Sequence, residues 1–375
     1  MNFDHLFKSG AIGNVSIKNR LVRSATWESR ATKDGYVTDS LIEFYKELAE
    51  GGIGLIITGY IAVDPIGAQT IRMSRIYDDS YMKGQTKLVN AVHESSDVKI
   101  AAQIAHTGNN VISKDLETVG PSAIRDPITK KFCRVLKKNE IEEIITKFVK
   151  AGIRAYECEY DMVQLHAAHG YLLSDFISPF TNRRDDEFGG SNLNRIKIIV
   201  DIYQGIRDHL GNDFPVIIKL TTRDFLGEGK GLSLEEGVEI AKHLVELGFD
   251  AIEPSCGRTN LRATNNKSFP SVNFNTPEDE NYFLPLAKAL KPGMKDCPLI
   301  LMGGIRNPLS AEKILRDQIA DFISMSRPFI YEPHLAKRWK NGDISPSLCT
   351  NCNACFGTGG RGEVHCVIRK KLEKS

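Results

Sequence analysis

The sequence lacks any run of 18 or more consecutive apolar residues, so it contains no candidate for a transmembrane helix. Its first ten residues, MNFDHLFKSG, lack the apolar stretch of a signal peptide, and we therefore expect a cytoplasmic protein. It also lacks an excess of charge of one sign, because 49 Lys and Arg residues face 47 Asp and Glu residues for a net charge of +2. A surface without a strong field argues against nucleic acid or an anionic membrane as a partner.

A linker is missing too, since no interior stretch of the 375 residues has the composition of one. A chain of this length exceeds a single core unless it adopts one of the larger single-domain architectures. What the sequence does contain is a short apolar stretch followed by a helical pattern, repeated eight times. The expected strands are residues 19–26, 53–58, 98–104, 160–165, 216–220, 251–254, 299–302 and 322–325. The expected helices are residues 38–50, 80–95, a stretch from 139 onward, 193–210, 233–247, 278–290, 308–316 and 333–340. Thr38 or Asp39 is expected to cap the first, Asn139 with Glu142 the third, and Ser233 with Glu236 the fifth as a capping box.

Alternation of this kind predicts an α/β fold with a parallel sheet, and eight units predict a closed TIM (β/α)8 barrel in a single domain. We assign residues 1–345 to the barrel, with an irregular excursion at residues 106–138 after the third strand, and residues 346–375 to a short Cys-rich C-terminal extension. A doubly wound open sheet is the alternative. It gives no reason for eight units, and no Gly-x-Gly-x-x-Gly turn follows an early strand.

The stretch from Gln164 to Ser191 carries the densest chemistry. His166 and His169 are expected where the fourth strand ends, and Tyr171 follows within reach of the same point. The two imidazoles can converge on one small atom, although the same pair is compatible with an incomplete zinc site or with buried structural histidines. The charged loop that follows is expected to cover something, because a long loop costs entropy to order.

In a parallel barrel all strand ends open at one face, so the residues around that mouth follow from the strand assignments. They are Ser24, Ala25, Thr26, Gly59, Gln103, His106, His166, His169, Lys219, Ser255, Cys256, Gly303, Gly304, Ser326 and Arg327. Gly303 and Gly304 let backbone N–H groups approach a ligand closely, and Arg327 adds a positive charge beside them. The ends of the last two strands therefore predict a phosphate site.

Several motifs together resemble those of the Old Yellow Enzyme family of flavin oxidoreductases, and the resemblance runs over nearly the whole chain. They are KNR at 18–20, GIGLIITGY at 52–60, QIAH at 103–106, PSAI at 121–124, HAAHGY at 166–171, SP at 178–179, NRRDDEFGGS at 182–191, NR at 194–195, GGI at 303–305 and RP at 327–328. The long segment from HAAHGY to FGGS is the most specific of them.

This resemblance implies FMN bound non-covalently in the barrel mouth. Around the flavin ring it implies Ala25, Thr26, Gly59, Gln103 and Lys219, with Gln103 as a hydrogen-bonding partner and Lys219 at the N1/O2 edge. Around the phosphate it implies Gly304, Ser326 and Arg327. The register leaves open whether Thr26 or Trp27 lies beside the flavin carbonyl.

The predicted reaction is the reduction of the activated C=C bond of an α,β-unsaturated carbonyl compound by hydride from reduced flavin, with electrons from NADH or NADPH. His166 and His169 would stabilise the developing negative charge on the carbonyl oxygen, and Tyr171 would give a proton to the α-carbon. Trp27 and Arg258 are predicted to contact the substrate, with Asn260 and Arg262 beside Arg258 in the loop at 257–277.

Four of the eight cysteines cluster near the C-terminus, at Cys349, Cys352, Cys355 and Cys366. In a reducing compartment such clustering favours a metal over disulfides. The spacing resembles the iron–sulfur segment of the 2,4-dienoyl-CoA reductase and 2-enoate reductase branch. It suits a [4Fe–4S] cluster or a four-cysteine zinc site, and unmetallated thiols are the third alternative. A cluster would need a partner such as ferredoxin or a separate reductase, and a homo-oligomer is compatible with the sequence.

Three other functions fit parts of the pattern. An amine dehydrogenase or demethylase can use the same barrel, but an amine offers no oxyanion for the paired histidines. A flavin-free lyase or aldolase would use Lys219 as a Schiff base. A non-catalytic electron-transfer subunit of a larger redox complex would be built around the four cysteines.

Overall fold

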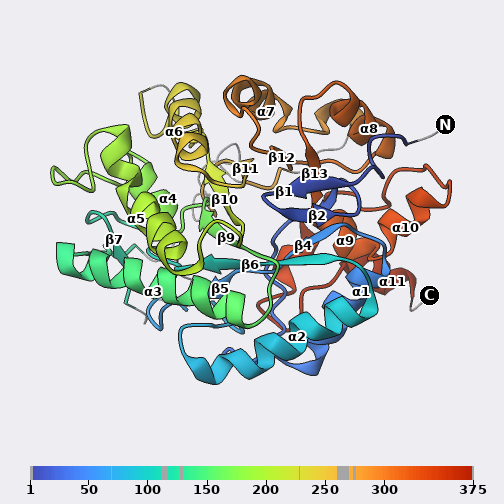
Figure 1. Cartoon of the computed structure of the whole chain (residues 1–375), viewed down its shortest axis with the longest axis horizontal. Coiled ribbons are helices and arrows are strands. Elements are labelled where there is room, and N and C mark those ends of the chain that lie inside the picture. Colours follow the sequence, from blue (N-terminus) through green and yellow to red (C-terminus); the bar gives the residue numbers. More distant parts are fainter. Residues whose placement is uncertain are drawn as a thin grey trace.

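The computed structural model describes residues 3–68, 70–110, 117–126, 130–227, 229–259, 270–272 and 276–373 (Figure 1). Eight parallel strands form the barrel, in the spatial order β11-β10-β9-β6-β4-β3-β13-β12. They are β3 (Leu21–Arg23), β4 (Leu55–Ile57), β6 (Lys99–Ala105), β9 (Met162–Ala167), β10 (Val216–Thr221), β11 (Ala251–Ser255), β12 (Ile300–Leu301) and β13 (Phe322–Met325). A parallel bridge between Ile252 and Leu299 joins the two ends of this row, so the ring closes. The TIM-barrel prediction is confirmed, and the open-sheet alternative is excluded.

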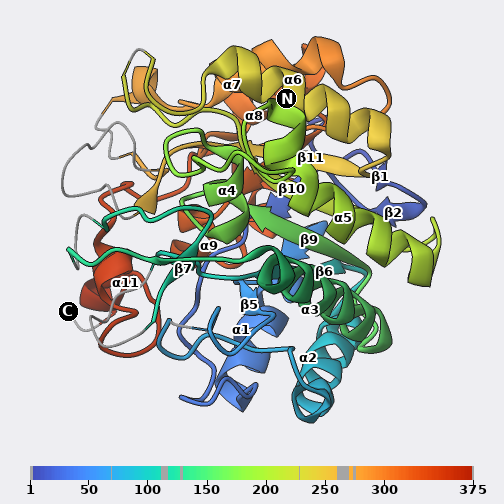
Figure 2. The same ribbon diagram turned by 90° about the vertical axis from the view of Figure 1, so that its left-hand side faces the viewer.

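The end of the barrel at which the strands begin is filled with apolar side chains. Every residue of β9 and β10 is buried, as expected for strands covered on both faces. Inside the ring, Met162 and Phe322 pack with Ile12 and Ile17, which come from the antiparallel hairpin β1 (Gly10–Ile12) and β2 (Val15–Ile17). Figure 2 shows this hairpin and α11 (Val367–Leu372) on opposite sides of the barrel. The hairpin, which the sequence analysis did not predict, plugs the end of the barrel away from the site.

Helices surround the strands, as Figure 1 shows. The larger ones are α1 (Asp39–Glu50), α2 (Met82–Ser95), α3 (Lys138–Glu157), α5 (Asn192–Leu210), α6 (Leu234–Leu247), α7 (Leu284–Leu290), α8 (Pro308–Arg316) and α10 (Leu335–Lys340). Shorter elements are β5 (Ile61–Ala62), η1 (Asp79–Tyr81), β7 (Val119–Gly120), β8 (Arg134–Val135), α4 (Leu172–Ile177), η4 (Pro277–Asp279), η5 (Lys291–Gly293), α9 (Arg327–Tyr331) and η6 (Ala354–Gly357). None of the helices in the described parts of the chain is long and apolar enough to cross a membrane.

Two of the predicted helix starts are confirmed and one is wrong. Thr38 caps α1, and Ser233 begins α6 with a capping box. Asn139 was expected to cap the third helix, with Glu142 three residues on. The cap is Lys137, two residues earlier, because Glu140 accepts a hydrogen bond from the backbone N–H of Lys137 at 2.8 Å and so completes a capping box there.

The stretch after Tyr171 was expected to be a long loop, and this prediction is wrong for its first part. Residues 172–177 form the short helix α4, and all six are buried. Leu172, Phe176 and Ile177 belong to the main hydrophobic core, while Asp175 pairs with a buried arginine. A helix as short as α4 depends on tertiary packing, which local sequence patterns do not reveal.

Candidate active site

A cavity of about 410 Å³ opens at the carboxyl ends of the barrel strands. The structure brings most of the predicted site residues together in its lining, namely Ala25, Thr26, Trp27, Gln103, His166, His169, Tyr171, Lys219, Gly303, Gly304, Ser326 and Arg327. These residues come from loops and strand ends that lie far apart in the sequence. Their convergence follows from the parallel barrel, which points every strand end at the same mouth.

The two histidines lie at right angles to each other. His166 is near the end of β9, His169 is in the following turn with a left-handed φ of +66°, and their ring centroids are 5.2 Å apart at 82°. Nε2 of His169 lies 2.6 Å from Oγ of Ser255. Nδ1 of His166 is buried and has no hydrogen-bond partner among the described residues. A buried polar atom of this kind in a cavity wall is a position where a polar ligand atom fits.

Both imidazoles are held in the neutral form. Burial lowers the pKa of His166 well below its usual value, and the neighbouring His169 and Lys219 lower it further. Burial and Lys219 likewise lower the pKa of His169. The pair can therefore donate hydrogen bonds to a ligand oxygen from neutral N–H groups at neutral pH, without carrying a permanent charge.

Tyr171 completes this wall of the cavity. Its ring centroid lies 4.7 Å from that of His166, and burial raises the pKa of its hydroxyl, an effect that a hydrogen bond with Tyr60 opposes. Tyr171 is therefore protonated at neutral pH and can act as an acid. Tyr60 was not predicted as a site residue, but its ring lies 5.3 Å from that of Tyr171 and its hydroxyl donates to Thr70 Oγ1 at 3.2 Å. Tyr60 could have been predicted from the sequence, because it directly follows Gly59 at the end of a strand.

The floor of the cavity is charged rather than neutral. Nζ of Lys219 lies 3.2 Å from Oε2 of Glu253, and both side chains are almost fully buried. Burial lowers the pKa of Lys219, and the Glu253 carboxylate opposes this by stabilising the ammonium. Glu253 also accepts hydrogen bonds from Ser24 Oγ at 2.7 Å and from Ser324 Oγ at 2.9 Å. Glu253 was missed as well, although a carboxylate inside an apolar strand of the sequence was a signal for it.

A chain of amides connects Glu253 to Gln103. Nε2 of Gln164 donates to Oε2 of Glu253 at 3.0 Å, and Nε2 of Gln103 donates to Oε1 of Gln164 at 2.7 Å. These hydrogen bonds use one N–H of the Gln103 amide and leave its carbonyl oxygen and its second N–H outside the series. The orientation of a predicted flavin-binding residue is thus set from beneath the cavity.

Thr26 and Trp27, the two residues that the sequence register allows beside the flavin carbonyl, both line the cavity. Thr26 Oγ1 lies 2.5 Å from Oγ of Ser326, which joins the first and last barrel strands at the mouth. Nε1 of Trp27 is buried without a hydrogen-bond partner in the described ranges.

Of the residues predicted to bind the flavin or the substrate, Gly59 and Arg258 do not reach the cavity lining, and neither do His106, Ser255 and Cys256 from the predicted mouth. The backbone N–H of Gly59 donates to Oε1 of Glu28 at 2.7 Å, and the space beside its Cα is filled by that carboxylate. Arg258 is 2 % exposed and forms an ion pair with Asp175 inside the core. Its charge is neutralised there, so the prediction that Arg258 contacts the substrate has no support in the geometry. Asn260 and Arg262 lie outside the described residues.

The four clustered cysteines have different surroundings. Cys355 lines the main cavity, Cys366 lines a neighbouring pocket of about 880 Å³, Cys349 is buried and Cys352 is exposed. Burial raises the pKa of Cys349, and it raises that of Cys355 to about 11, with a further contribution from the neighbouring thiols. Within the described parts of the chain, no three His, Cys, Asp or Glu side chains are arranged to hold a metal ion. The arrangement therefore does not support the predicted cluster.

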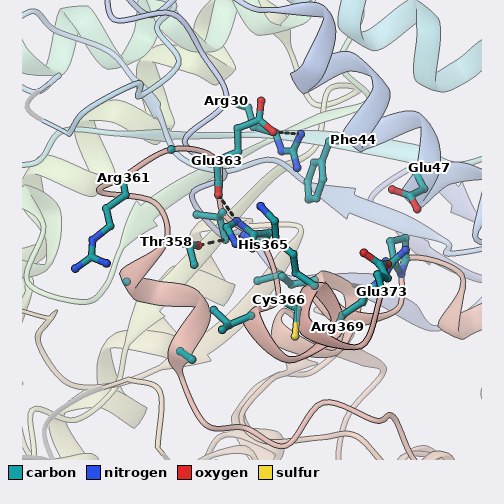
Figure 3. A pocket seen from close by; sticks show the side chains of 18 residues that line it. Arg30, Phe44, Glu47, Thr358, Arg361, Glu363, His365, Cys366, Arg369 and Glu373 are labelled. Carbon is teal, nitrogen blue, oxygen red and sulfur yellow. Dashed lines mark hydrogen bonds and ion pairs between the residues drawn. The ribbon is translucent and has the colours of Figure 1, made fainter. Parts of the chain in front are cut away.

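The neighbouring pocket lies between α1, α9 and the C-terminal segment, by which we mean residues 346–373 (Figure 3). An ion pair of 2.7 Å between Arg30 and Glu363 ties the segment to the barrel, and the backbone N–H of His365 donates to Thr358 Oγ1 at 3.2 Å. Val364 lines both this pocket and the main cavity. The segment is thus a wall between the two hollows.

The residues around the main cavity fit an FMN cofactor. Gly303 and Gly304 have φ values of +112° and +76°, which favour glycine and leave their backbone without side chains at the predicted phosphate end. Arg327 supplies a cation beside them, and Lys219 and Gln103 lie in the same lining. Bound there, FMN would supply hydride chemistry that no protein side chain provides.

The family model for "NADH:flavin oxidoreductase / NADH oxidase family" matches residues 5–344 of the chain. The chain is 38% identical over 362 residues to an NADH oxidase from Thermoanaerobacter brockii, a match that covers 95% of this chain and 54% of that protein. It therefore spans about half the length of this curated relative.

Two solved structures share the fold. A 2-naphthoyl-CoA reductase in complex with 2-naphthoyl-CoA superposes with a TM-score of 0.88 at 28% identity, covering 100% of this chain and 58% of that one. The Old Yellow Enzyme homologue from Zymomonas mobilis superposes with a TM-score of 0.75 at 26% identity, covering 92% and 95%. These matches show that the chain belongs to the NADH:flavin oxidoreductase / NADH oxidase family, the family of Old Yellow Enzyme.

Proposed function

We propose that this protein is an FMN-dependent oxidoreductase that reduces the activated C=C bond of an α,β-unsaturated carbonyl compound with electrons from NADH or NADPH. The observation that carries the proposal is the wall formed by His166, His169 and Tyr171. It places two neutral hydrogen-bond donors and one protonated acid in a single buried cavity.

In this proposal the substrate carbonyl oxygen accepts hydrogen bonds from His166 and His169. Negative charge develops on that oxygen during hydride addition to the β-carbon, so donors aimed at it stabilise the transition state more than the ground state. Ser255 holds the ring of His169 through the contact between Oγ and Nε2 at 2.6 Å. Tyr171 then delivers a proton to the α-carbon. FMN would supply the hydride when bound in the cavity.

The charged floor has a separate role. Lys219 places a positive charge at the inner end of the cavity, where a reduced, anionic flavin ring requires one. Glu253 keeps that ammonium charged in spite of its burial. Gln103, oriented through Gln164, offers polar groups to the ring edge.

The histidine wall favours this reaction over an amine oxidation. An amine substrate has no oxygen on which charge develops, so the donors of His166 and His169 would have no oxyanion to stabilise. A flavin-free Schiff-base enzyme is disfavoured because Lys219 is engaged with Glu253 and Ser24 beneath the cavity. The iron–sulfur cluster stays a prediction from the cysteine spacing alone, and iron and acid-labile sulfide analysis of anaerobically purified protein tests it.

The proposal is tested with the full chain, purified under anaerobic conditions and loaded with FMN. The flavin absorbance near ~450 nm is expected to bleach with NADH or NADPH and to return when cyclohexenone is added, with cyclohexanone as the product. A flavin that is reduced by the nucleotide but not reoxidised by any of a panel of enones, enals and enoates would contradict the proposal. Reoxidation by a secondary or tertiary amine is not expected, because reduced flavin needs an electron acceptor.

A further inference from the structure

The phosphate end of the cavity is built partly from the C-terminal segment. Nη1 of Arg327 donates to the backbone oxygen of Asn351 at 3.1 Å and to Oδ1 of Asn353 at 2.7 Å. From the sequence, the phosphate site was expected at the ends of the last two barrel strands alone. In the structure, the arginine of that site is held by two asparagines that come more than twenty residues later in the chain.

Asn353 is held in place from both sides. Its Nδ2 donates to the backbone oxygen of Ser271 at 2.8 Å, and its Oδ1 accepts from Ser271 Oγ at 3.0 Å as well as from Arg327. The base of the segment is also tied to the barrel, because the backbone N–H of Ser347 donates to the oxygen of Arg306 at 2.8 Å. The guanidinium of Arg327 also donates to the backbone oxygen of Val272 at 3.3 Å and to the Tyr282 hydroxyl at 3.5 Å, so the asparagines and these two groups together hold Arg327 in the cavity lining.

Asn351 has a feature that the packing does not explain. Its side chain is 2 % exposed and lines the cavity, and its Oδ1 lies 4.0 Å from Sγ of Cys349. Its Nδ2 is buried and has no hydrogen-bond partner in the part of the chain that the structure describes. Leaving an amide N–H unpaired in a buried site is costly, so such a donor in a cavity wall indicates a polar ligand atom.

The left-handed backbone of Asn351 does not explain why its Nδ2 is left unpaired. Asn351 has a φ of +55°, a region that asparagine tolerates well, and Asn281 has nearly the same φ of +58°. Asn281 also carries a buried unpaired amide atom, but this is the acceptor Oδ1, and Asn281 does not line the cavity. A left-handed asparagine therefore does not require an unpaired amide donor, whereas Asn351 has one, lines the cavity, and accepts a hydrogen bond from Arg327 through its backbone oxygen.

We propose that the C-terminal segment completes the FMN phosphate site, with the Nδ2 of Asn351 as a phosphate donor and Asn353 as the residue that positions Arg327. This inference rests on the binding of FMN in the cavity, not on the choice of substrate. The dianionic phosphate satisfies the orphan amide and faces the guanidinium that the two asparagines hold. FMN binding and the folding of the C-terminal segment onto the barrel then stabilise each other, as linkage requires.

The test compares FMN with riboflavin, which has the same ring and lacks the phosphate. Dissociation constants are measured by quenching of flavin fluorescence with the full chain after removal of bound flavin. Asn351→Gly keeps the left-handed backbone and removes the donor, so we expect about a 10–100-fold weaker FMN complex, the usual loss for a hydrogen bond to a charged group. Riboflavin binding is expected to stay unchanged. Asn351→Asp should weaken FMN binding further, because a carboxylate repels the phosphate.

Asn353→Gly tests the positioning role and is expected to weaken FMN binding by about 3–10-fold, with riboflavin again unaffected. Asn281→Gly is the matched control, and it should leave the dissociation constants of both FMN and riboflavin unchanged. Equal weakening of FMN and riboflavin in the Asn351 variants would show a purely structural role and overturn the proposal. An unchanged FMN affinity would overturn it as well. Since the readout is binding, a failure of the proposed enone reduction would leave this result intact.

Discussion

The histidine wall and the lysine floor of the cavity handle buried polarity in opposite ways. Burial holds His166 and His169 neutral, whereas Lys219 is paired with the equally buried carboxylate of Glu253. Neutral donors suit a charge that appears only during the reaction, because they cost little desolvation at rest. A permanent ammonium suits a charge that a bound cofactor carries for longer. One cavity can hold both only because the lysine has its own counter-charge.

The largest effect is expected from breaking the floor. Lys219→Met leaves the Glu253 carboxylate buried without its cation, and we expect a loss of about 3–5 kcal/mol in the free energy of unfolding. Denaturation in urea measures it, with the double variant Lys219→Met and Glu253→Gln as the control. The double variant should recover most of the loss, because neither member of the pair is then charged. If the double variant is as unstable as the single one, the two residues do not act as an ion pair.

The next effect concerns the wall. His166→Ala removes one of two donors, and we expect kcat for cyclohexenone reduction to fall by about 10²–10³-fold with the free energy of unfolding nearly preserved. His93→Ala is the matched control, because His93 pairs with Asp161 outside the cavity lining. Reduction of the flavin by NADH, followed in the absence of the enone, reports whether the effect is confined to the enone half of the reaction. A kcat within experimental error of the unaltered protein would remove the oxyanion role from His166.

The smallest effect is the pH dependence of stability that neutral histidines impose. The folded-state pKa of both histidines lies below the unfolded value of about 6.5, so the unfolded chain binds more protons as the pH falls. Above a pH of about 6.5 the two histidines therefore cost no stability. As the pH falls below about 6.5, each histidine should lower the free energy of unfolding by about 1.4 kcal/mol per pH unit, until its folded pKa is reached. Asp175 acts in the opposite sense, because its folded pKa is raised to about 6 and it favours the folded state as the pH falls through that value.

Comparing the unaltered chain with a histidine variant separates the contribution of the histidines from that of Asp175, which both proteins contain. Urea titrations at pH 7.5 and 5.5 are compared for the unaltered chain and for the double variant His166→Gln and His169→Gln. The unaltered chain should lose more stability than the variant over this range. An equal loss in both proteins would mean that the histidines are protonated in the folded state, and the contrast between wall and floor would fail.

Much of the fold was predictable because barrel strands and capped helices leave local signals. The apolar stretches at 216–220 and 322–325 became β10 and β13, and the Ser233–Glu236 capping box begins α6 as expected. The elements that were missed are those stabilised by distant contacts. The hairpin β1–β2 packs its apolar residues inside the barrel, and α4 is too short to form without the core around it.

The candidate site divides in the same way. Residues at strand exits, such as His166, Lys219 and Arg327, were found because a parallel barrel sends every strand to one mouth. Gly59 was expected at the site from the same strand-exit argument and Arg258 from its loop position, but the structure shows them engaged with Glu28 and Asp175 instead. Which side chain turns toward a cavity depends on the partner that competes for it, and that partner is distant in the sequence.

The sequence by itself determined the barrel, the mouth and the identity of the groups that gather there, because strand period, helix caps and motif spacing are local properties of the chain. The tertiary structure decided the state of those groups. Burial makes the histidines neutral, Glu253 keeps Lys219 charged, and Asn351 and Asn353 bring the C-terminal segment to Arg327. Desolvation and ion pairing depend on what surrounds a side chain in space, and residues far apart in the sequence provide those surroundings.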